Sequence, residues 1–188
     1  MAARQPLFPV SSVPWIATGA ALAALCIAWL AQYGFGLAPC ELCYWQRYGY
    51  WGAIALGVVA ILQPAETPRR RATLWLLTLA FVATAGIALF HVGVEQKWWE
   101  GTAACTGVSF EGLTPEEMQK AINEAPIVRC DVPAWTMFGI SMAGYNILYA
   151  LALAAFTLKG ALRSKAASRN GPPIQPRSAC RAISPRTS

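Results

Sequence analysis

Charged side chains are scarce in this sequence, and long stretches of it have none. Asp, Glu, Lys and Arg make up 13% of the 188 residues, whereas 56% are hydrophobic. Four stretches lack all four charged residue types: Gln5 to Cys40, Tyr48 to Ala65, Ala72 to Val94 and Val132 to Leu158. An apolar helix needs roughly 20 residues to cross about 30 Å of hydrocarbon. A soluble core in so small a chain does not bury four such helices, so we predict an all-α integral membrane protein, a four-transmembrane-helix bundle.

The same stretches divide the chain. We expect a short N-terminal segment (1–14), one membrane domain (15–158) and a disordered tail (159–188). Within the membrane domain the expected spans are 15–32, 43–62, 72–94 and 135–158, with a short outer loop at 33–42 and a long one at 95–134. The first hydrophobic run also resembles a cleaved signal peptide. Against cleavage, Pro39 stands just before Cys40 and three further spans follow.

Lys and Arg are rare on one side of the predicted membrane and frequent on the other. One side carries Arg4, Arg69, Arg70, Arg71, Lys159, Arg163, Lys165, Arg169, Arg177, Arg181 and Arg186, whereas the long outer loop carries Lys97, Lys120 and Arg129. The positive-inside rule then puts both termini in the cytoplasm and both cysteine-bearing loops outside, which in a bacterium is the periplasm. We interpret the net charge of +6 as this orientation signal, because no aromatic–basic module for nucleic acid accompanies it.

Histidine is also scarce, since His91 is the single one. One histidine excludes haem ligation by two histidines of one chain and weakens a mixed cysteine–histidine zinc site. An all-thiolate zinc site from the four loop cysteines (Cys40, Cys43, Cys105 and Cys130) stays open, although such a site usually uses two closely spaced pairs. We assign no metal.

The motif Pro39-Cys40-Glu41-Leu42-Cys43 lies at the outer mouth of the second span. A disulfide in a Cys-x-x-Cys pair closes almost no loop and so stabilises a fold very little. The pair is therefore better placed for electron transfer than for a structural cross-link. Arg47 follows Cys43 by one helical turn, and the helix N-terminus and this guanidinium both favour a thiolate. The alternative role for Arg47 is to anchor the helix by reaching the lipid headgroups.

His91 and Arg47 are expected at similar depth, near the outer ends of the third and second spans. Together they could donate hydrogen bonds to the carbonyl oxygens of an apolar electron acceptor that enters from the bilayer. A lone histidine is more often structural, so the spacing of these two residues alone is a weak signal.

Cys105 and Cys130 flank a long stretch of the outer loop. A purely structural bridge between them would stabilise the fold by roughly 3 kcal/mol in the chain-entropy model. Because a second, loop-free dithiol lies on the same side, we favour a two-step thiol–disulfide relay through mixed disulfides.

The long loop also contains a helix signal, Thr114-Pro115-Glu116-Glu117. It combines an N-cap threonine, a proline at the first helical position and a glutamate at the third. The apolar stripe of this short helix suits either the membrane surface or the helical bundle.

Several motifs together resemble the disulfide bond formation protein B family. They are Pro39-Cys40-Glu41-Leu42-Cys43-Tyr44-Trp45-Gln46-Arg47, His91, and Cys130-Asp131 leading to Trp135 and Phe138-Gly139-Ile140-Ser141-Met142. The resemblance covers about Trp15 to Leu158. Gln46 departs from it, since some family members have glutamate there, and the tail matches nothing.

The resemblance implies a membrane oxidoreductase that reoxidises a periplasmic thioredoxin-fold disulfide oxidase and passes the electrons to quinone, ubiquinone or menaquinone. It implies that Cys105 and Cys130 form the outer redox disulfide and Cys40 and Cys43 the inner one. Cys105 would bond to the partner, Cys130 would resolve or shuttle within the loop, and Cys40 would exchange with the loop cysteines. Cys43 would face quinone with Arg47 and His91. The location implied is the bacterial inner membrane. Two alternatives stay open: a related oxidoreductase that serves a dedicated partner, and a non-enzymatic membrane scaffold whose cysteines form static bridges or hold zinc.

Overall fold

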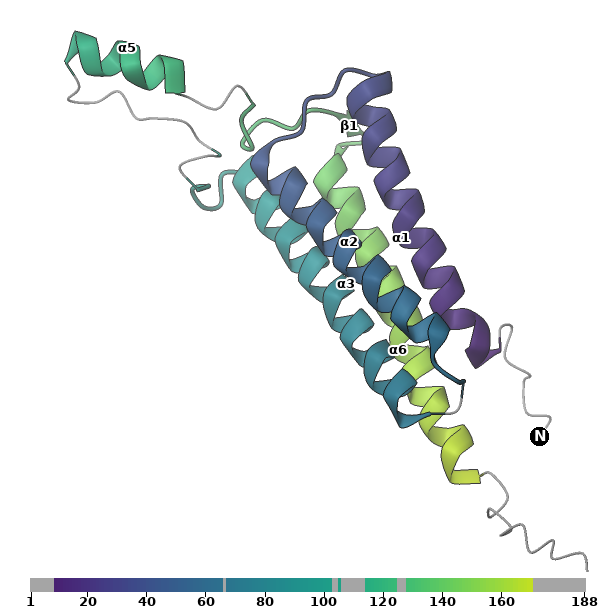
Figure 1. Ribbon diagram of the computed structural model, residues 1–188. Coiled ribbons are helices and arrows are strands. Elements are labelled where there is room, and N and C mark those ends of the chain that lie inside the picture. The colour runs from purple at the N-terminus through teal and green to yellow at the C-terminus, as the bar shows by residue number, and fades with distance from the viewer. Residues whose placement is uncertain (1–8, 66, 103–104, 106–113, 125–127, 171–188) are drawn as a thin grey trace, which may run out of the picture.

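Four long helices lie side by side in the computed structural model of the protein (Figure 1). The structure describes residues 9–65, 67–102, 105, 114–124 and 128–170. The long helices are α1 (Val13–Trp29), α2 (Glu41–Leu62), α3 (Pro68–Glu95) and α6 (Met142–Asn170). A short helix, α5 (Pro115–Glu124), and a two-stranded hairpin, β1 (Thr136–Met137) with β2 (Ile140–Ser141), lie at one end. Because Cys40 and Cys130 lie at that end, we call it the cysteine end.

Local sequence signals explain where the helices begin and end. Thr67 caps α3, with its hydroxyl oxygen accepting from the Arg70 amide at 3.3 Å, and Pro68 opens the helix. Residues Leu30–Gly34 continue α1 as one π-helical turn before Gly36, at a φ of 68°, turns the chain. The predicted capping box is confirmed, since the Thr114 amide donates to Glu117 Oε2 at 2.8 Å and the Glu117 amide donates to the Thr114 hydroxyl at 3.4 Å.

Three helices are long and apolar enough to cross a membrane, namely Val10–Gly34, Pro68–Glu95 and Met142–Ser164. Large apolar side chains point outward, as Leu62, Leu79 and Leu148 do, whereas the interior is rich in alanine. A soluble bundle has the opposite arrangement, because water drives its large apolar side chains inward. The chain is therefore an all-α membrane protein.

Two expectations about the last helix are wrong. The helix predicted from Trp135 begins later, at Met142, because the chain first forms the β1–β2 hairpin around Phe138 and Gly139. Both turn residues have positive φ, 51° and 77°, which interrupts a helix. The tail expected to be disordered from residue 159 instead continues α6 to Asn170, and residues 171–188 lie outside the described part of the chain.

Close helix packing depends on small residues at the crossings. A Cβ atom at Gly57 of α2 would overlap Thr18 Oγ1 of α1, whereas a Cβ at Gly52 of the same helix would meet nothing within 4 Å. Between α3 and α6 the hydroxyls of Thr78 and Thr157 share a hydrogen bond of 2.9 Å. Backbones that approach this closely gain the van der Waals contact that holds helices together in lipid.

These contacts predict that Gly57→Val destabilises the bundle by about 1–3 kcal/mol, the usual cost of overpacking. The measurement is unfolding in detergent micelles followed by tryptophan fluorescence. Gly52→Val is the matched control on the same helix, because its side chain enters open space. Equal stability of the two variants would contradict the close α1–α2 contact.

Candidate active site

Cys40 and Cys43 lie at the N-terminus of α2, where the chain changes from extended to helical. Cys40 is the N-cap residue, and its Sγ lies 3.1 Å from Cys43 Sγ. Cys40 is buried, with 5% of its surface exposed, whereas Cys43 is partly exposed. The two thiols are thus close enough to exchange one proton or to form a disulfide with a small movement.

Hydrogen bonding with Cys43 and burial raise the pKa of Cys40 to about 12, against a lowering contribution from His91. In the reduced protein, Cys40 therefore keeps its proton at neutral pH. Cys43 is left as the sulfur of the pair that can react as a nucleophile.

This pKa predicts the order of alkylation in fully reduced protein. Iodoacetamide should modify Cys43 before Cys40, because only a thiolate reacts. Since the Cys40 pKa lies above the experimental range, its labelling rate should rise roughly tenfold per pH unit from pH 7 to 9.5. Peptide mass spectrometry distinguishes the sites. Preferential labelling of Cys40 would contradict the assignment.

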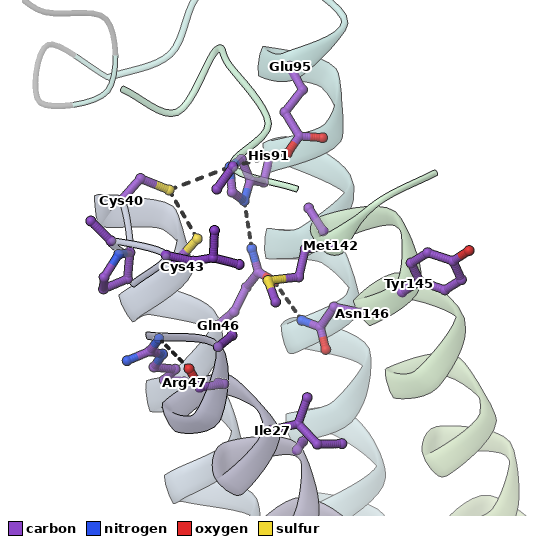
Figure 2. A pocket seen from close by; sticks show the side chains of 18 of the residues that line it. Ile27, Cys40, Cys43, Gln46, Arg47, His91, Glu95, Met142, Tyr145 and Asn146 are labelled. Atoms are coloured by element: carbon purple, nitrogen blue, oxygen red, sulfur yellow. Dashed lines mark hydrogen bonds and ion pairs between the residues drawn. The ribbon is translucent and has the colours of Figure 1, made fainter. Parts of the chain in front are cut away.

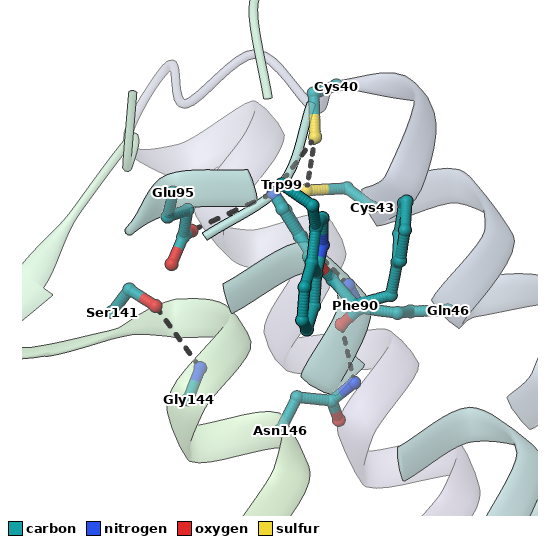
Figure 3. A network of polar contacts seen from close by, with 10 residues as sticks. Cys40, Cys43, Gln46, Phe90, Glu95, Trp99, Ser141, Gly144 and Asn146 are labelled. Carbon is teal, nitrogen blue, oxygen red and sulfur yellow. Dashed lines mark hydrogen bonds and ion pairs between the residues drawn. The ribbon is translucent and has the colours of Figure 1, made fainter. Parts of the chain in front are cut away.

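A tryptophan-rich turn after α3 brings the chain back to the start of α2. Trp99 stacks on Phe90 at a centroid distance of 5.8 Å, and its Nε1 donates to the Phe90 carbonyl at 3.0 Å (Figure 3). Gly93 makes room for the indole ring, since a Cβ there would overlap it. The Thr102 hydroxyl then donates to Glu41 Oε2 at 3.0 Å. These contacts place the following Cys105 beside the start of α2.

Cys130 lies between Cys105 and the inner pair. Its amide donates to the Cys105 carbonyl at 3.0 Å, and its Sγ lies within 4.8 Å of Cys40 Sγ. Burial, together with the neighbouring Cys105 thiol, raises the pKa of Cys130. Cys40, Cys105 and Cys130 belong to one buried cluster with Cys43 packed against it. The structure therefore brings all four predicted cysteines together.

His91 connects Cys40 to a polar network inside the bundle. Its Nε2 lies 3.5 Å from Cys40 Sγ, and its Nδ1 lies 2.9 Å from Gln46 Nε2 (Figure 2). Asn146 of α6 donates to Gln46 Oε1 at 2.6 Å and accepts from the Tyr50 hydroxyl. Because the Gln46 amide group then donates to Nδ1, the ring hydrogen of neutral His91 lies on Nε2 and points toward Cys40.

Arg47 lies one turn below Cys43 and is held by α1. Its guanidinium donates to Gln32 Oε1 at 2.6 Å and to the Ala28 carbonyl at 3.2 Å, and it lies over the Tyr44 ring. The Ala28 carbonyl comes just before the π-helical turn, where the regular hydrogen-bond pattern of α1 changes. Arg47 therefore has a fixed position in the protein, and the anchoring role considered from the sequence does not describe its contacts.

A cavity of about 570 Å³ opens beside these residues. Cys40, Cys43, Arg47 and His91 line it with Gln46 and Asn146, and apolar side chains of α1, α6 and the segments 37–39 and 128–134 supply most of the rest. Such a volume with few polar groups suits a small apolar ligand with a polar head. Arg47 and His91, predicted at similar depth, do line the same cavity.

Sequence reasoning missed three residues of the site. Two of them, Asn146 and Tyr50, lie in otherwise apolar helices. Polar groups in such helices indicate buried hydrogen bonds, which these two residues make. Glu95 at the end of α3 is the third, with its side chain 4% exposed and Oε1 3.7 Å from His91 Nε2. A buried carboxylate at a helix end is difficult to distinguish by sequence from one in a solvated loop.

This fold and site define a class: a helical membrane protein with clustered thiols beside an apolar cavity. A family model described as disulfide bond formation protein DsbB matches residues 11–159, and the chain belongs to this family. It is therefore a membrane thiol–disulfide oxidoreductase.

Individual relatives are similar at moderate identity. An uncharacterized protein of Rickettsia prowazekii is 28% identical over 135 residues, which cover 71% of this chain and 77% of the relative. Disulfide bond formation protein B of Haemophilus influenzae is 26% identical over 132 residues (68% and 72%). Disulfide bond formation protein B 2 of Pseudomonas syringae is 29% identical over 143 residues (70% and 77%). No solved structure matches the chain.

Proposed function

We propose that the protein oxidises a periplasmic thioredoxin-fold dithiol oxidase and passes the electrons to quinone in the bacterial inner membrane. The observation that carries this proposal is the position of Cys130. Its amide donates to the Cys105 carbonyl, its Sγ lies within 4.8 Å of Cys40 Sγ, and Cys40 and Cys43 line the apolar cavity. Outer dithiol, inner dithiol and cavity thus form one continuous path.

The exchange steps together pass two electrons from the partner dithiol to the inner cysteine pair. A thiolate of the partner attacks the Cys105–Cys130 disulfide at Cys105, and the partner's second thiolate releases Cys105 as the partner becomes a disulfide. Cys130 then attacks Cys40 of the Cys40–Cys43 disulfide, which frees the Cys43 thiolate. Attack of Cys105 on Cys130 restores the outer disulfide and leaves the inner pair reduced.

The inner end of the path fits a quinone. When bound, ubiquinone or menaquinone accepts two electrons and two protons. Arg47 and His91 Nε2 supply donors for carbonyl oxygens, and apolar side chains of α1 and α6 surround the remaining volume. Cys43 lines the same cavity, so its sulfur is the thiolate that we assign to electron transfer.

The topology extends the description of the fold. We infer that α2 is the fourth span, since it lies beside three apolar helices and its 22 residues reach about 33 Å at 1.5 Å per residue. The polar pair Gln46 and Arg47 lowers its hydropathy, and both side chains are used inside the protein. With Lys and Arg concentrated at the opposite end, the cysteine end lies in the periplasm.

Arg47→Met should raise the KM for quinone by about 10–100-fold, the loss expected for one charge-assisted hydrogen bond, with a smaller effect on kcat. The measurement is the initial rate of quinone reduction against quinone concentration. Arg69→Met, an exposed arginine at the far end of the bundle, is the matched control. An unchanged KM would remove Arg47 from the quinone site.

The test of the proposed function uses purified protein in detergent with a reduced thioredoxin-fold dithiol partner. Without quinone we expect only the stoichiometric loss of partner thiols that the protein's own disulfides can cause, and multiple turnovers only when a soluble quinone is added, with one quinol formed for each further partner disulfide. Cys26→Ser, on an exposed surface of α1, should behave like the native protein. Multiple turnovers without quinone, or no turnover with several quinones, would overturn the proposal.

A further inference from the structure

Three buried side chains at the cysteine end bring their donor atoms close to the ring of a fourth, His91. The donor atoms of Cys40, His91 and Cys130 all lie within 4.8 Å of one another. Glu95 joins them, because its Oε1 lies 3.7 Å from His91 Nε2 (Figure 2). Two thiols, an imidazole and a carboxylate are the ligand types that zinc takes in proteins.

The known distances fit tetrahedral coordination. With Zn–S near 2.3 Å and Zn–N near 2.0 Å, tetrahedral geometry separates a sulfur from a nitrogen by about 3.6 Å and a nitrogen from an oxygen by about 3.4 Å. Cys40 Sγ lies 3.5 Å and Glu95 Oε1 lies 3.7 Å from His91 Nε2. With the His91 ring hydrogen moved to Nδ1 and the Gln46 and Asn146 side-chain amides turned so that Gln46 accepts it, small side-chain movements would place a metal ion between these groups.

Glu95 supplies an independent indication of a cation. Its side chain is 4% exposed, and among the described residues Oε2 has no hydrogen-bond partner. A buried carboxylate oxygen without a partner is costly unless a proton or a cation neutralises it. Arg129, which lines the same cavity, already forms a bidentate ion pair with Asp131 at 2.9 and 2.7 Å.

We propose that the reduced protein binds one Zn²⁺ through Cys40, Cys130, His91 and Glu95. This ligand set replaces the all-thiolate site considered from the sequence. The site exists only while Cys40 and Cys130 are thiols, since a disulfide sulfur is no thiolate ligand. Bound zinc holds both exchange cysteines, so zinc is a reversible inhibitor of the reduced state. Binding requires thiols and not quinone, so this proposal and the proposed function can fail separately.

Zinc binding is measured on purified full-length protein without quinone. It is measured first on protein reduced with a phosphine and again after the same protein has been oxidised with diamide. A chromophoric chelator competes for zinc, and Co²⁺ is the spectroscopic probe. We expect about one Zn²⁺ per reduced chain, at least about 100-fold weaker binding after oxidation, and tetrahedral cobalt bands with thiolate-to-cobalt charge transfer.

Variants identify the ligands. His91→Gln and Glu95→Gln should each weaken binding by at least about 10-fold, whereas Cys26→Ser and Cys105→Ser should bind like the native protein. Equal zinc binding by the reduced and oxidised forms, or full binding by both His91→Gln and Glu95→Gln, would overturn the site. If a variant fails to fold, the cobalt spectrum of the native protein tests the proposed zinc site instead. An octahedral spectrum, or one without thiolate-to-cobalt charge transfer, would also overturn the site.

Discussion

Cys43→Ser is expected to eliminate steady-state oxidation of the partner while leaving one round of exchange. Serine cannot form the inner disulfide or deliver electrons from a thiolate, so turnover should fall by at least about 1000-fold, to the uncatalysed rate. The outer pair, Cys105 and Cys130, is unchanged by this substitution. It can therefore oxidise about one partner dithiol per chain before the reaction stops.

The measurement is a rapid-quench time course of partner thiols with excess quinone. A burst of about one disulfide per chain without further turnover supports the order of the path. The matched control is Cys26→Ser, which removes a thiol from α1 outside the cluster. Continued quinone-dependent turnover by Cys43→Ser would show that another group passes electrons to quinone.

Cys130→Ser should separate the outer half of the path from the inner half. Without Cys130 the loop has no disulfide for the partner to attack, so partner oxidation should fall by at least about 100-fold, with no burst. The inner pair and the cavity stay intact. A small dithiol such as dithiothreitol, which can reduce Cys40–Cys43 directly, should therefore still drive quinone reduction close to the native rate.

The comparison is made in one preparation, with the partner and then with dithiothreitol as the electron donor. Loss of activity with the partner alone supports the bridging position of Cys130, which bonds to the Cys105 carbonyl through its amide and lies within 4.8 Å of Cys40 Sγ through its own sulfur. Equal loss with both donors would mean that Cys130 maintains the cavity instead. Native activity with the partner would exclude Cys130 from the path.

Much of the fold could be predicted because lipid imposes simple rules on a sequence. Helices that cross hydrocarbon must be long and nearly free of charge, and this pattern located α1, α3 and α6. The start of α6 was wrong for a local reason, since Trp135 to Ser141 is apolar enough to continue a span. Only the positive φ angles at Phe138 and Gly139 reveal the hairpin.

The cysteines and Arg47 could be predicted because their chemistry is rare in an apolar chain. The partners that position them could not. Gln46 was noted only as a departure from the family pattern, but it links His91 to Asn146 on a different helix. Such contacts depend on how α2, α3 and α6 rotate against one another, and a single sequence gives no direct signal of helix rotation.

A single-turnover reaction tests the central claim, that the four cysteines and the cavity form one electron path to quinone. Fully reduced protein receives one equivalent of quinone, quinone absorbance is followed, and the cysteine pairs are identified by mass spectrometry of quenched samples. The account predicts one quinol per two thiols lost, with Cys40–Cys43 as the first disulfide and Cys105–Cys130 appearing later. Quinol formation with Cys105–Cys130 oxidised first, or thiol loss without quinol, would contradict it.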